Sequence, residues 1–283
     1  MKICHTKADV RATVRDWKLA GDEVGVVTTM GYLHEGHLGL VRLARQRADR
    51  VVATIFVNPT QFGPNEDLDT YPRDEERDLA LLKAEGVDAV FLPSVEEMYG
   101  AAGDTYVEVP GLSGILQGAL RPGHFRGVAT VVAKLFNIVM PDFAVFGEKD
   151  YQQLTLIRQM VRDLDMPLEI VGHPTVREPD GLAMSSRNVR LTPEHRQEAL
   201  VLSRSLDLAE DLARSAPAVA DLKAAVRAEL AKAPSADVKS VDFRDAETLE
   251  ELDGPLDRPA VILLAVRFAD VLLIDQRVVA PRP

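Results

Sequence analysis

The fold is decided by one stretch, Val24-Gly-Val-Val-Thr-Thr-Met-Gly-Tyr-Leu-His-Glu-Gly-His37. It opens as an apolar run of the kind that a buried parallel strand carries. Met30-Gly31 and then apolar residues at helical spacing over residues 38–44 follow, so the pattern predicts a strand, a turn and a helix. The N-terminus of a helix offers unpaired N–H groups and a positive dipole end, which suit phosphate. His34 and His37 are three positions apart, so both can point at the same anion from one helix face.

Three interpretations of the two histidines compete. A zinc site of the His-Glu-x-x-His type is excluded, because its second histidine comes four positions after the first, whereas His37 comes three after His34. A solvated loop that happens to hold two histidines stays open on the local pattern alone. The third interpretation is a nucleotide site at the end of the strand.

Composition excludes several classes of protein. The chain has 283 residues, which suits one large domain or two, and its formal net charge of −11 argues against a nucleic-acid-binding surface. A site for ATP must therefore gather its cations locally. Cys4 is the only cysteine, so no intrachain disulfide can form, and we expect a cytoplasmic protein. We expect no signal peptide, because the N-terminal segment has no apolar h-region, and no membrane span, because the apolar runs are broken well before about 18 residues.

Up to about residue 176 the sequence alternates between strand and helix patterns. Strands are predicted at residues 24–29, 51–57, 87–92, 105–109, 143–146 and 168–171. Helices are predicted at 6–19, 73–85, 95–99, 111–117, 128–139 and 151–164, and one more begins near His34 and includes residues 38–44. This alternation predicts an α/β fold, a Rossmann-like parallel sheet with helices on both faces. Ligands should then lie beyond the carboxyl ends of the strands, where His34 to His37 and Gly147 to Asp150 both fall.

Beyond residue 176 the pattern changes. Thr192-Pro193 predicts a helix start with threonine as N-cap. Helices are predicted near residues 194–214 and 219–232, and β-like runs near 239–245, 261–268 and 270–274. Helices followed by strands predict a smaller α+β domain. We therefore expect a Rossmann-like domain at 1–176 and a C-terminal lid domain at 177–283.

Five strings, in order along the chain, resemble one family. They are Met30–His37, Asn58-Pro-Thr-Gln-Phe-Gly63, Gly147-Glu-Lys-Asp-Tyr-Gln-Gln153, Val176-Arg-Glu178 and Gly181-Leu-Ala-Met-Ser-Ser-Arg187. Together they resemble the pantothenate synthetase (pantoate–β-alanine ligase) family of the nucleotidylyltransferase superfamily, whose signature matches His34-x-Gly36-His37. Two positions depart from the family pattern: Thr28 stands where proline is common, and Gln117 where some relatives carry an acid.

The resemblance implies an ATP-dependent ligase with two half-reactions. The carboxylate of pantoate attacks the α-phosphate of ATP and releases pyrophosphate, and the amine of β-alanine then attacks the pantoyl adenylate and releases AMP. The first step joins two anions, so catalysis is expected to come mainly from positioning and charge stabilisation. Mg²⁺ is expected to bind mainly through the ATP phosphates, with no protein ligand assigned. The acidic run at residues 74–78 is expected to be an ordinary solvated helix face.

The resemblance also assigns the site residues. It makes His34, His37, Lys149 and Arg187 catalytic, with His37 as a proton donor. It assigns ATP binding to Met30, Gly31, Tyr32, Leu33, His34, Gly36, His37, Gly147, Glu148, Lys149, Asp150, Val176, Met184, Ser185, Ser186 and Arg187, with Asp150 on the ribose and the Val176 backbone on adenine. Gln61 and Gln153 are assigned to the substrates pantoate and β-alanine.

The family pattern further implies a homodimer whose second domain closes over the site. One alternative is another nucleotidylyltransferase that acts on a phosphorylated acceptor, which would need Arg or Lys where Gln61 and Gln153 stand. Another is a non-catalytic nucleotide sensor, which has no need to keep both histidines together with Lys149 and Arg187.

Overall fold

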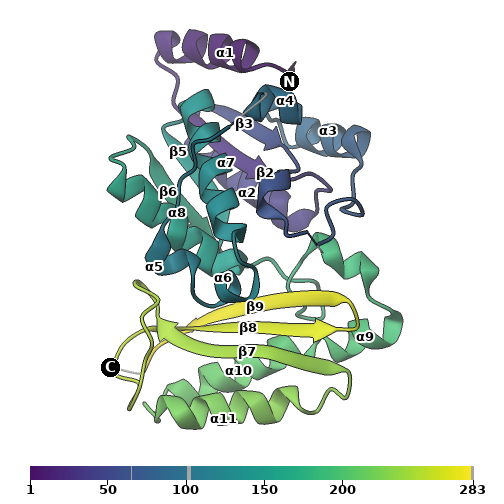
Figure 1. Ribbon diagram of the computed structural model, residues 1–283, viewed down its shortest axis with the longest axis vertical. Helices are drawn as coiled ribbons and strands as arrows, with labels where there is room; N and C mark the ends of the chain where they lie inside the picture. The colour runs from purple at the N-terminus through teal and green to yellow at the C-terminus, as the bar shows by residue number, and fades with distance from the viewer. Residues whose placement is uncertain (65, 101–102, 282–283) are drawn as a thin grey trace. The chain divides into compact units, whose positions relative to one another are not determined.

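The computed structural model describes residues 1–64, 66–100 and 103–281 (Figure 1). The chain divides into two compact units. The first unit comprises Met1–Gly147 and Leu156–Pro174, and the second comprises Glu148–Thr155 and Thr175–Pro283. The expected domain limits of 1–176 and 177–283 stay a prediction, and the two units are described separately below.

The first unit is built on a parallel sheet, as predicted, and six strands of the described residues form it. The strands are β1 (Lys2–Cys4), β2 (Val24–Thr29), β3 (Arg50–Ile55), β4 (Ala89–Phe91), β5 (Phe143–Gly147) and β6 (Glu169–His173), in the order β1-β4-β3-β2-β5-β6. The chain adds strands on one side of β2 and then, from β5 onward, on the other. Such a reversal marks the point at which open α/β sheets bind ligands. The carboxyl ends of β2 and β5 lie at that point.

Helices connect these strands. They are α1 (Lys7–Ala20), α2 (Glu35–Arg47), α3 (Glu75–Ala84), α4 (Val95–Tyr99), α5 (Pro110–Ser113), α6 (Gln117–Leu120), α7 (His124–Val139) and α8 (Tyr151–Asp163), with the 3₁₀ helix η1 (Pro59–Gln61). Val26 and Val27 of β2 point to opposite faces of the sheet, and both are fully buried. Both faces of the sheet are therefore covered at this strand, and Val27 packs in one core cluster with Leu40 and Val41 of α2.

Strand β5 is set beside β2 by a close contact between Gly25 and Phe143. The two residues are paired in the parallel register, and a Cβ atom at Gly25 would lie 2.7 Å from the Phe143 ring. Only glycine leaves room for the ring at this position. The packing therefore fixes β5, and with it Gly147, next to the strand that leads to the histidines.

Four details of the first unit differ from the predictions. The strand predicted at 105–109 is wrong, because the N–H and C=O of Val107 pair with the Thr130 hydroxyl of α7 and none of the described strands lies alongside. Strand β1 was not predicted; it has three residues at a sheet edge, too few to show a period. Helix α7 begins at His124, four residues before the predicted start. In α3, Asp78 is buried, although residues 74–78 were expected to form a solvated helix face.

The second unit contains a three-stranded antiparallel sheet with two helices packed on it (Figure 1). Its strands are β7 (Ala236–Asp245), β8 (Ala260–Phe268) and β9 (Val271–Val279), and its helices are α9 (Pro193–Glu198), α10 (Val201–Ala213) and α11 (Val219–Leu230). It also holds the 3₁₀ helices η2 (Glu148–Asp150) and η3 (Ser186–Arg190). Thr192 caps α9 as predicted. The single helix predicted at 194–214 is wrong in one respect, since it is divided between α9 and α10.

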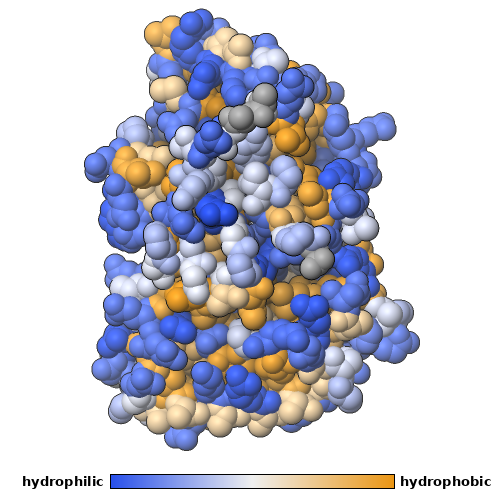
Figure 2. All heavy atoms as spheres, in the orientation of Figure 1, coloured by the Kyte–Doolittle hydropathy of each residue, from blue (hydrophilic) through white to orange (hydrophobic). Residues whose placement is uncertain are grey.

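No helix in the described part of the chain is long and apolar enough to cross a membrane. On the face drawn in Figure 2, hydrophobic and hydrophilic residues are interspersed.

Candidate active site

The turn between β2 and α2 has an unusual backbone. Gly31 and Tyr32 both adopt positive φ angles, of 81° and 49°. A side chain in this left-handed region costs about 1–2 kcal/mol, so the conformation of Tyr32 has to be stabilised by its surroundings. The Thr29 hydroxyl accepts a hydrogen bond from the Gly31 N–H at 3.2 Å and donates to the Thr54 carbonyl at 2.8 Å. The start of the turn is thereby tied to the sheet.

Asp78 of α3 holds the rest of this turn. Its carboxylate accepts the backbone N–H of Tyr32 at 2.6 Å and that of Leu33 at 2.7 Å. The residue is 1% exposed, and burial raises the pKa of its carboxyl group while the two N–H groups act in the opposite direction. The expectation of a plain solvated face for residues 74–78 is therefore wrong at Asp78. Its spacing of four from the apolar Leu82 was a signal of burial, because such residues share a helix face.

His34 and His37 lie together at the start of α2. His34 is the N-cap residue, and its Nδ1 accepts the Gly36 N–H at 3.1 Å. The His37 Nδ1 accepts the His34 N–H at 3.3 Å, and the two ring centroids are 4.1 Å apart. A ring nitrogen that accepts a hydrogen bond carries no proton, so each neutral ring has its proton on Nε2. Both imidazoles are therefore Nε2–H donors at a helix N-terminus, as an anion site requires.

Gln61 lies beside Met30, the residue that opens the turn. The Gln61 Nε2 contacts the Met30 sulfur at 3.2 Å, and the Gln61 Oε1 accepts a hydrogen bond from Asn58 at 3.0 Å. Gln61 is 8% exposed, so it is not the surface glutamine that composition alone would favour. Asn58 is fully buried and also accepts the Tyr99 hydroxyl at 2.6 Å. No separate role was predicted for Asn58, although its side chain orients the Gln61 amide.

Three of the five family strings meet at strand β9 in the second unit. Both η2 (Glu148–Asp150) and η3 (Ser186–Arg190) contact β9. The Tyr151 hydroxyl at the start of α8 donates to the Ala246 carbonyl at 2.7 Å, which fixes the segment that carries Lys149, Asp150 and Gln153. Lys149 is half-buried, whereas Asp150 is exposed.

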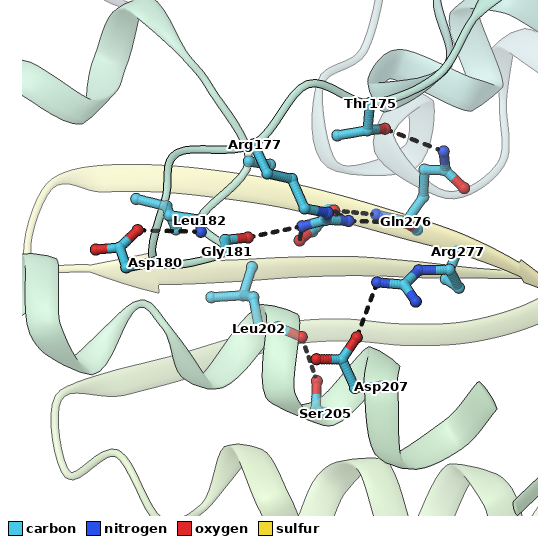
Figure 3. Close-up of polar contacts among 12 residues, drawn as sticks. Thr175, Arg177, Asp180, Gly181, Leu182, Leu202, Ser205, Asp207, Gln276 and Arg277 are labelled. Atoms are coloured by element: carbon cyan, nitrogen blue, oxygen red, sulfur yellow. Dashed lines mark hydrogen bonds and ion pairs between the residues drawn. The ribbon is translucent and has the colours of Figure 1, made fainter. Parts of the chain in front are cut away.

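A short hairpin brings Val176 and Met184 together. The Met184 N–H donates to the Val176 carbonyl at 2.9 Å, and the Glu178 N–H donates to the Leu182 carbonyl at 2.8 Å. Gly181 turns the hairpin with a φ of 96° (Figure 3). Ser185 follows directly and caps η3, because its hydroxyl accepts the Arg187 N–H at 3.2 Å. The segment expected at adenine is therefore continuous with Ser185–Arg187, which are also expected to bind ATP.

The structure thus gathers the expected residues into two sets, one in each unit. The first unit holds Met30, Gly31, Tyr32, Leu33, His34, Gly36 and His37 in the turn, Gln61 in η1, and Gly147 at the end of β5. The second unit holds Glu148, Lys149 and Asp150 in η2, Gln153 in α8, Val176 and Met184 in the hairpin, and Ser185, Ser186 and Arg187 at η3. The described residues contain no group of three or more His, Cys, Asp or Glu side chains that could hold a metal ion.

These features define a class of protein, the α/β nucleotide-binding enzymes, in which a helix start at the switch point of a parallel sheet presents donors to phosphate. The particular family follows from comparison with known proteins. The model of the family described as pantoate-beta-alanine ligase matches residues 2–278. The chain belongs to this family, which confirms the resemblance found in the sequence.

Individual relatives agree over the whole chain. A pantothenate synthetase from Pelotomaculum thermopropionicum is 54% identical over 279 residues, covering 98% of this chain and 99% of the relative. The crystal structure of pantothenate synthetase from Thermus thermophilus matches with a TM-score of 0.94 and 49% identity, covering 99% of this chain and all of that one. Pantoate-beta-alanine ligase from Francisella tularensis, complexed with beta-gamma ATP and beta-alanine, matches with a TM-score of 0.80 and 33% identity, covering 98% of this chain and 97% of that one.

Proposed function

We infer that this chain is an enzyme that condenses (R)-pantoate with β-alanine at the expense of ATP, giving pantothenate, AMP and pyrophosphate by way of a pantoyl adenylate. The observation that carries this function is the family match over residues 2–278, which takes in both units. Nothing in the fold or the site favours the alternative of a nucleotidylyltransferase with a phosphorylated acceptor. Buried neutral Gln61 supports pantoate as the substrate, because an amide can donate to a carboxylate and accept from hydroxyl groups.

We assign charge stabilisation at the phosphates to His34 and His37. Both rings have Nε2–H donors, and both Nδ1 atoms are held by backbone N–H groups, so the donors are oriented before ATP binds. Negative charge that develops on the α-phosphate oxygens as the pantoate carboxylate attacks is thereby stabilised by hydrogen bonds, without reorganisation of the site. The positive end of the α2 helix dipole adds to the same effect.

The second unit supplies the cations of the proposed ATP site. Lys149 provides a point charge for phosphate, and the Arg187 guanidinium suits two oxygens of the departing pyrophosphate. Ser185 and Ser186 add hydroxyl donors, and Asp150 is proposed to accept from the ribose hydroxyls. Gln153 is proposed to share the binding of pantoate with Gln61.

Mg²⁺ is proposed to arrive with ATP. The groups assigned to the phosphates are imidazole N–H, ammonium, guanidinium and hydroxyl donors, which suit phosphate oxygens and not a cation. The triphosphate and water would therefore supply most of the metal ligands, which neutralises charge on the leaving pyrophosphate. We further propose a cytoplasmic homodimer in which residues 177–283 form a lid domain, in keeping with the family pattern.

The direct test is an assay that contains ATP, Mg²⁺, pantoate and β-alanine, with AMP, pyrophosphate and pantothenate measured together. Equal amounts of AMP and pantothenate are expected, and both should disappear when pantoate is omitted. With β-alanine omitted, a burst of pyrophosphate close to one per active site should remain, because the adenylate forms first. The proposed function would be contradicted if this protein is inactive in an assay in which a known pantothenate synthetase is active.

A further inference from the structure

A buried ion pair joins the hairpin at 176–184 to strand β9. The Arg177 guanidinium donates two parallel hydrogen bonds to the Asp275 carboxylate, from Nη1 to Oδ2 at 2.7 Å and from Nη2 to Oδ1 at 2.9 Å. The Asp275 side chain is 1% exposed and that of Arg177 is 20% exposed. Figure 3 shows the Arg177 side chain extending from the hairpin toward β9 beside Gln276. No role in the proposed chemistry has been given to either residue of the pair.

Further contacts surround the pair. Arg177 Nη1 also donates to the Gly181 carbonyl at 3.1 Å, so one side chain contacts both β9 and the tip of its own hairpin. The Thr175 hydroxyl accepts a hydrogen bond from the Gln276 Nε2 at 3.3 Å. A Cβ atom at Gly181 would lie 3.0 Å from the Ser203 hydroxyl of α10, so the tip is closely packed as well. The hairpin is therefore attached at its start, middle and tip.

The position of Arg177 within the hairpin links the pair to the expected adenine site. Arg177 forms the single bridge of the hairpin with Ala183. Val176 and Met184 are the next residues on the two strands, and they are joined by the hydrogen bond of 2.9 Å. A shift of Arg177 relative to Asp275 would therefore displace its neighbours Val176 and Met184, and also Ser185, which follows Met184.

Stability alone does not account for such a pair. Two charges lose hydration when they are buried, and well-packed apolar residues of similar volume often stabilise a protein as well or better. The fork of an arginine on a carboxylate, however, fixes both distance and angle, which an apolar contact does not. An ion pair at this point is consequently better suited to setting a geometry than to stabilising the second unit.

We propose that Arg177 and Asp275 are positioning residues, which hold the hairpin in the register that the adenine of ATP requires and so control ATP binding and adenylate formation without touching ATP. This inference rests on the proposed assignment of Val176 and Met184 to Arg187 to the nucleotide. The proposal predicts a specific effect. Loosening the ion pair should raise KM for ATP more than KM for pantoate, whereas general damage to the enzyme should not affect ATP selectively.

The experiment compares three variants with a matched control. Arg177→Lys keeps the charge and loses the fork, Asp275→Asn keeps the shape and loses the charge, and Arg177→Met combined with Asp275→Leu removes both charges at once. The control is Arg277→Met on β9, which breaks the contacts of Arg277 with Asp207 (Figure 3) and Glu210 and leaves the hairpin attached. Steady-state KM for ATP and for pantoate, kcat, and thermal unfolding midpoints are measured for all four.

We expect KM for ATP to rise about tenfold or more in the three pair variants, because small displacements of binding groups have large kinetic effects. KM for pantoate should stay within about twofold, and the double variant should keep an unfolding midpoint close to that of the unchanged protein. An unchanged KM for ATP in the folded double variant would overturn the proposal, as would an equal rise in Arg277→Met. If all three pair variants fail to fold, the pair is structural and the proposal is likewise wrong. An inactive unchanged protein would instead count against the proposed function.

Discussion

The carboxylate of Asp78 accepts the backbone N–H of Tyr32 at 2.6 Å, across 46 positions of sequence. Tyr32 has a φ of 49°, and the same carboxylate accepts the N–H of Leu33 at 2.7 Å. The turn that presents His34 is therefore shaped by a charged group that itself has no part in the proposed chemistry. A buried carboxylate is costly to desolvate, so its presence here is best explained by the two donors that it holds.

Replacement of Asp78 by asparagine should impair adenylate formation. The amide has one acceptor oxygen, so its NH₂ group must face one of the two backbone donors, and the turn should shift. We expect kcat/KM for ATP to fall about tenfold or more, measured by pyrophosphate release. The control is Asp74→Ala, which removes the N-cap of the same helix at a cost of about 1 kcal/mol and leaves the turn alone. Similar kinetic losses in both variants would mean that α3 acts only through stability.

Because the pKa of Asp78 is raised, a fall in pH should increase stability through this group but decrease activity. Because burial holds the pKa of the folded state above the ordinary value of 3.8, the folded protein binds this proton more tightly than the unfolded chain. As the pH falls through the folded pKa toward 3.8, this group should therefore raise the free energy of unfolding. Over the same window the protonated carboxyl loses an acceptor for the turn, so adenylation should decline.

The comparison with Asp78→Asn isolates this group from the other acids. The difference in unfolding free energy between the two proteins, measured by denaturant titration at several pH values, should depend on pH only below the folded pKa of Asp78. A difference that stays constant over the acidic range would contradict the assignment. So would a loss of adenylation with the same acidic limb in both proteins.

Substitutions at His34 can separate its two functions, as helix cap and as phosphate donor. Asparagine caps a helix well, so His34→Asn should unfold near the midpoint of the unchanged protein, whereas His34→Ala should lose about 1 kcal/mol. Both variants lack the Nε2–H donor, so both should form adenylate about 10²-fold more slowly, as His37→Ala should. Single-turnover release of pyrophosphate measures this step. A near-normal rate of adenylate formation in His34→Asn would show that His34 acts only as a helix cap.

The substitution Gln61→Glu should weaken the binding of pantoate. The new carboxylate would replace the amide that is held between Asn58 and Met30, and would oppose the carboxylate of the substrate. We expect KM for pantoate to rise about tenfold or more, the scale of a lost hydrogen bond to a charged group, with a smaller change in KM for ATP. Gln46→Glu, an exposed position of α2, makes the same change of charge and should leave both constants unaltered. A larger effect on ATP than on pantoate would count against the assignment of Gln61.

Much of this architecture could be predicted because its signals are local. The apolar run at β2 and the Thr192-Pro193 helix start each lie within a few residues, and each was found where it was expected. The histidines of the site were found for the same reason. Asp78 and Arg177 were missed as supporting residues because their partners lie 46 and 98 positions away. The spacing of Asp78 from Leu82 indicates that Asp78 is buried, but nothing in a single sequence indicates which distant residue such a side chain contacts.

Gly127 of α7 sets how closely this helix approaches the residues that hold Gln61. A Cβ atom at Gly127 would lie 2.3 Å from the Thr60 carbonyl oxygen and 2.7 Å from the Gln61 Cα, both of which are backbone atoms that cannot rotate away. Gly127→Ala should therefore destabilise the protein by about 1–3 kcal/mol and displace η1. Because the Asn58 amide also donates to the Gly127 carbonyl, at 3.2 Å, KM for pantoate should rise as well. Gly111→Ala is the matched control, since no neighbouring atom lies within 4 Å of the added methyl group. Its free energy of unfolding and its KM for pantoate should be unchanged. Denaturant unfolding and steady-state kinetics on the two variants test the contact, and a stable Gly127→Ala enzyme with normal use of pantoate would show that η1 can move without cost.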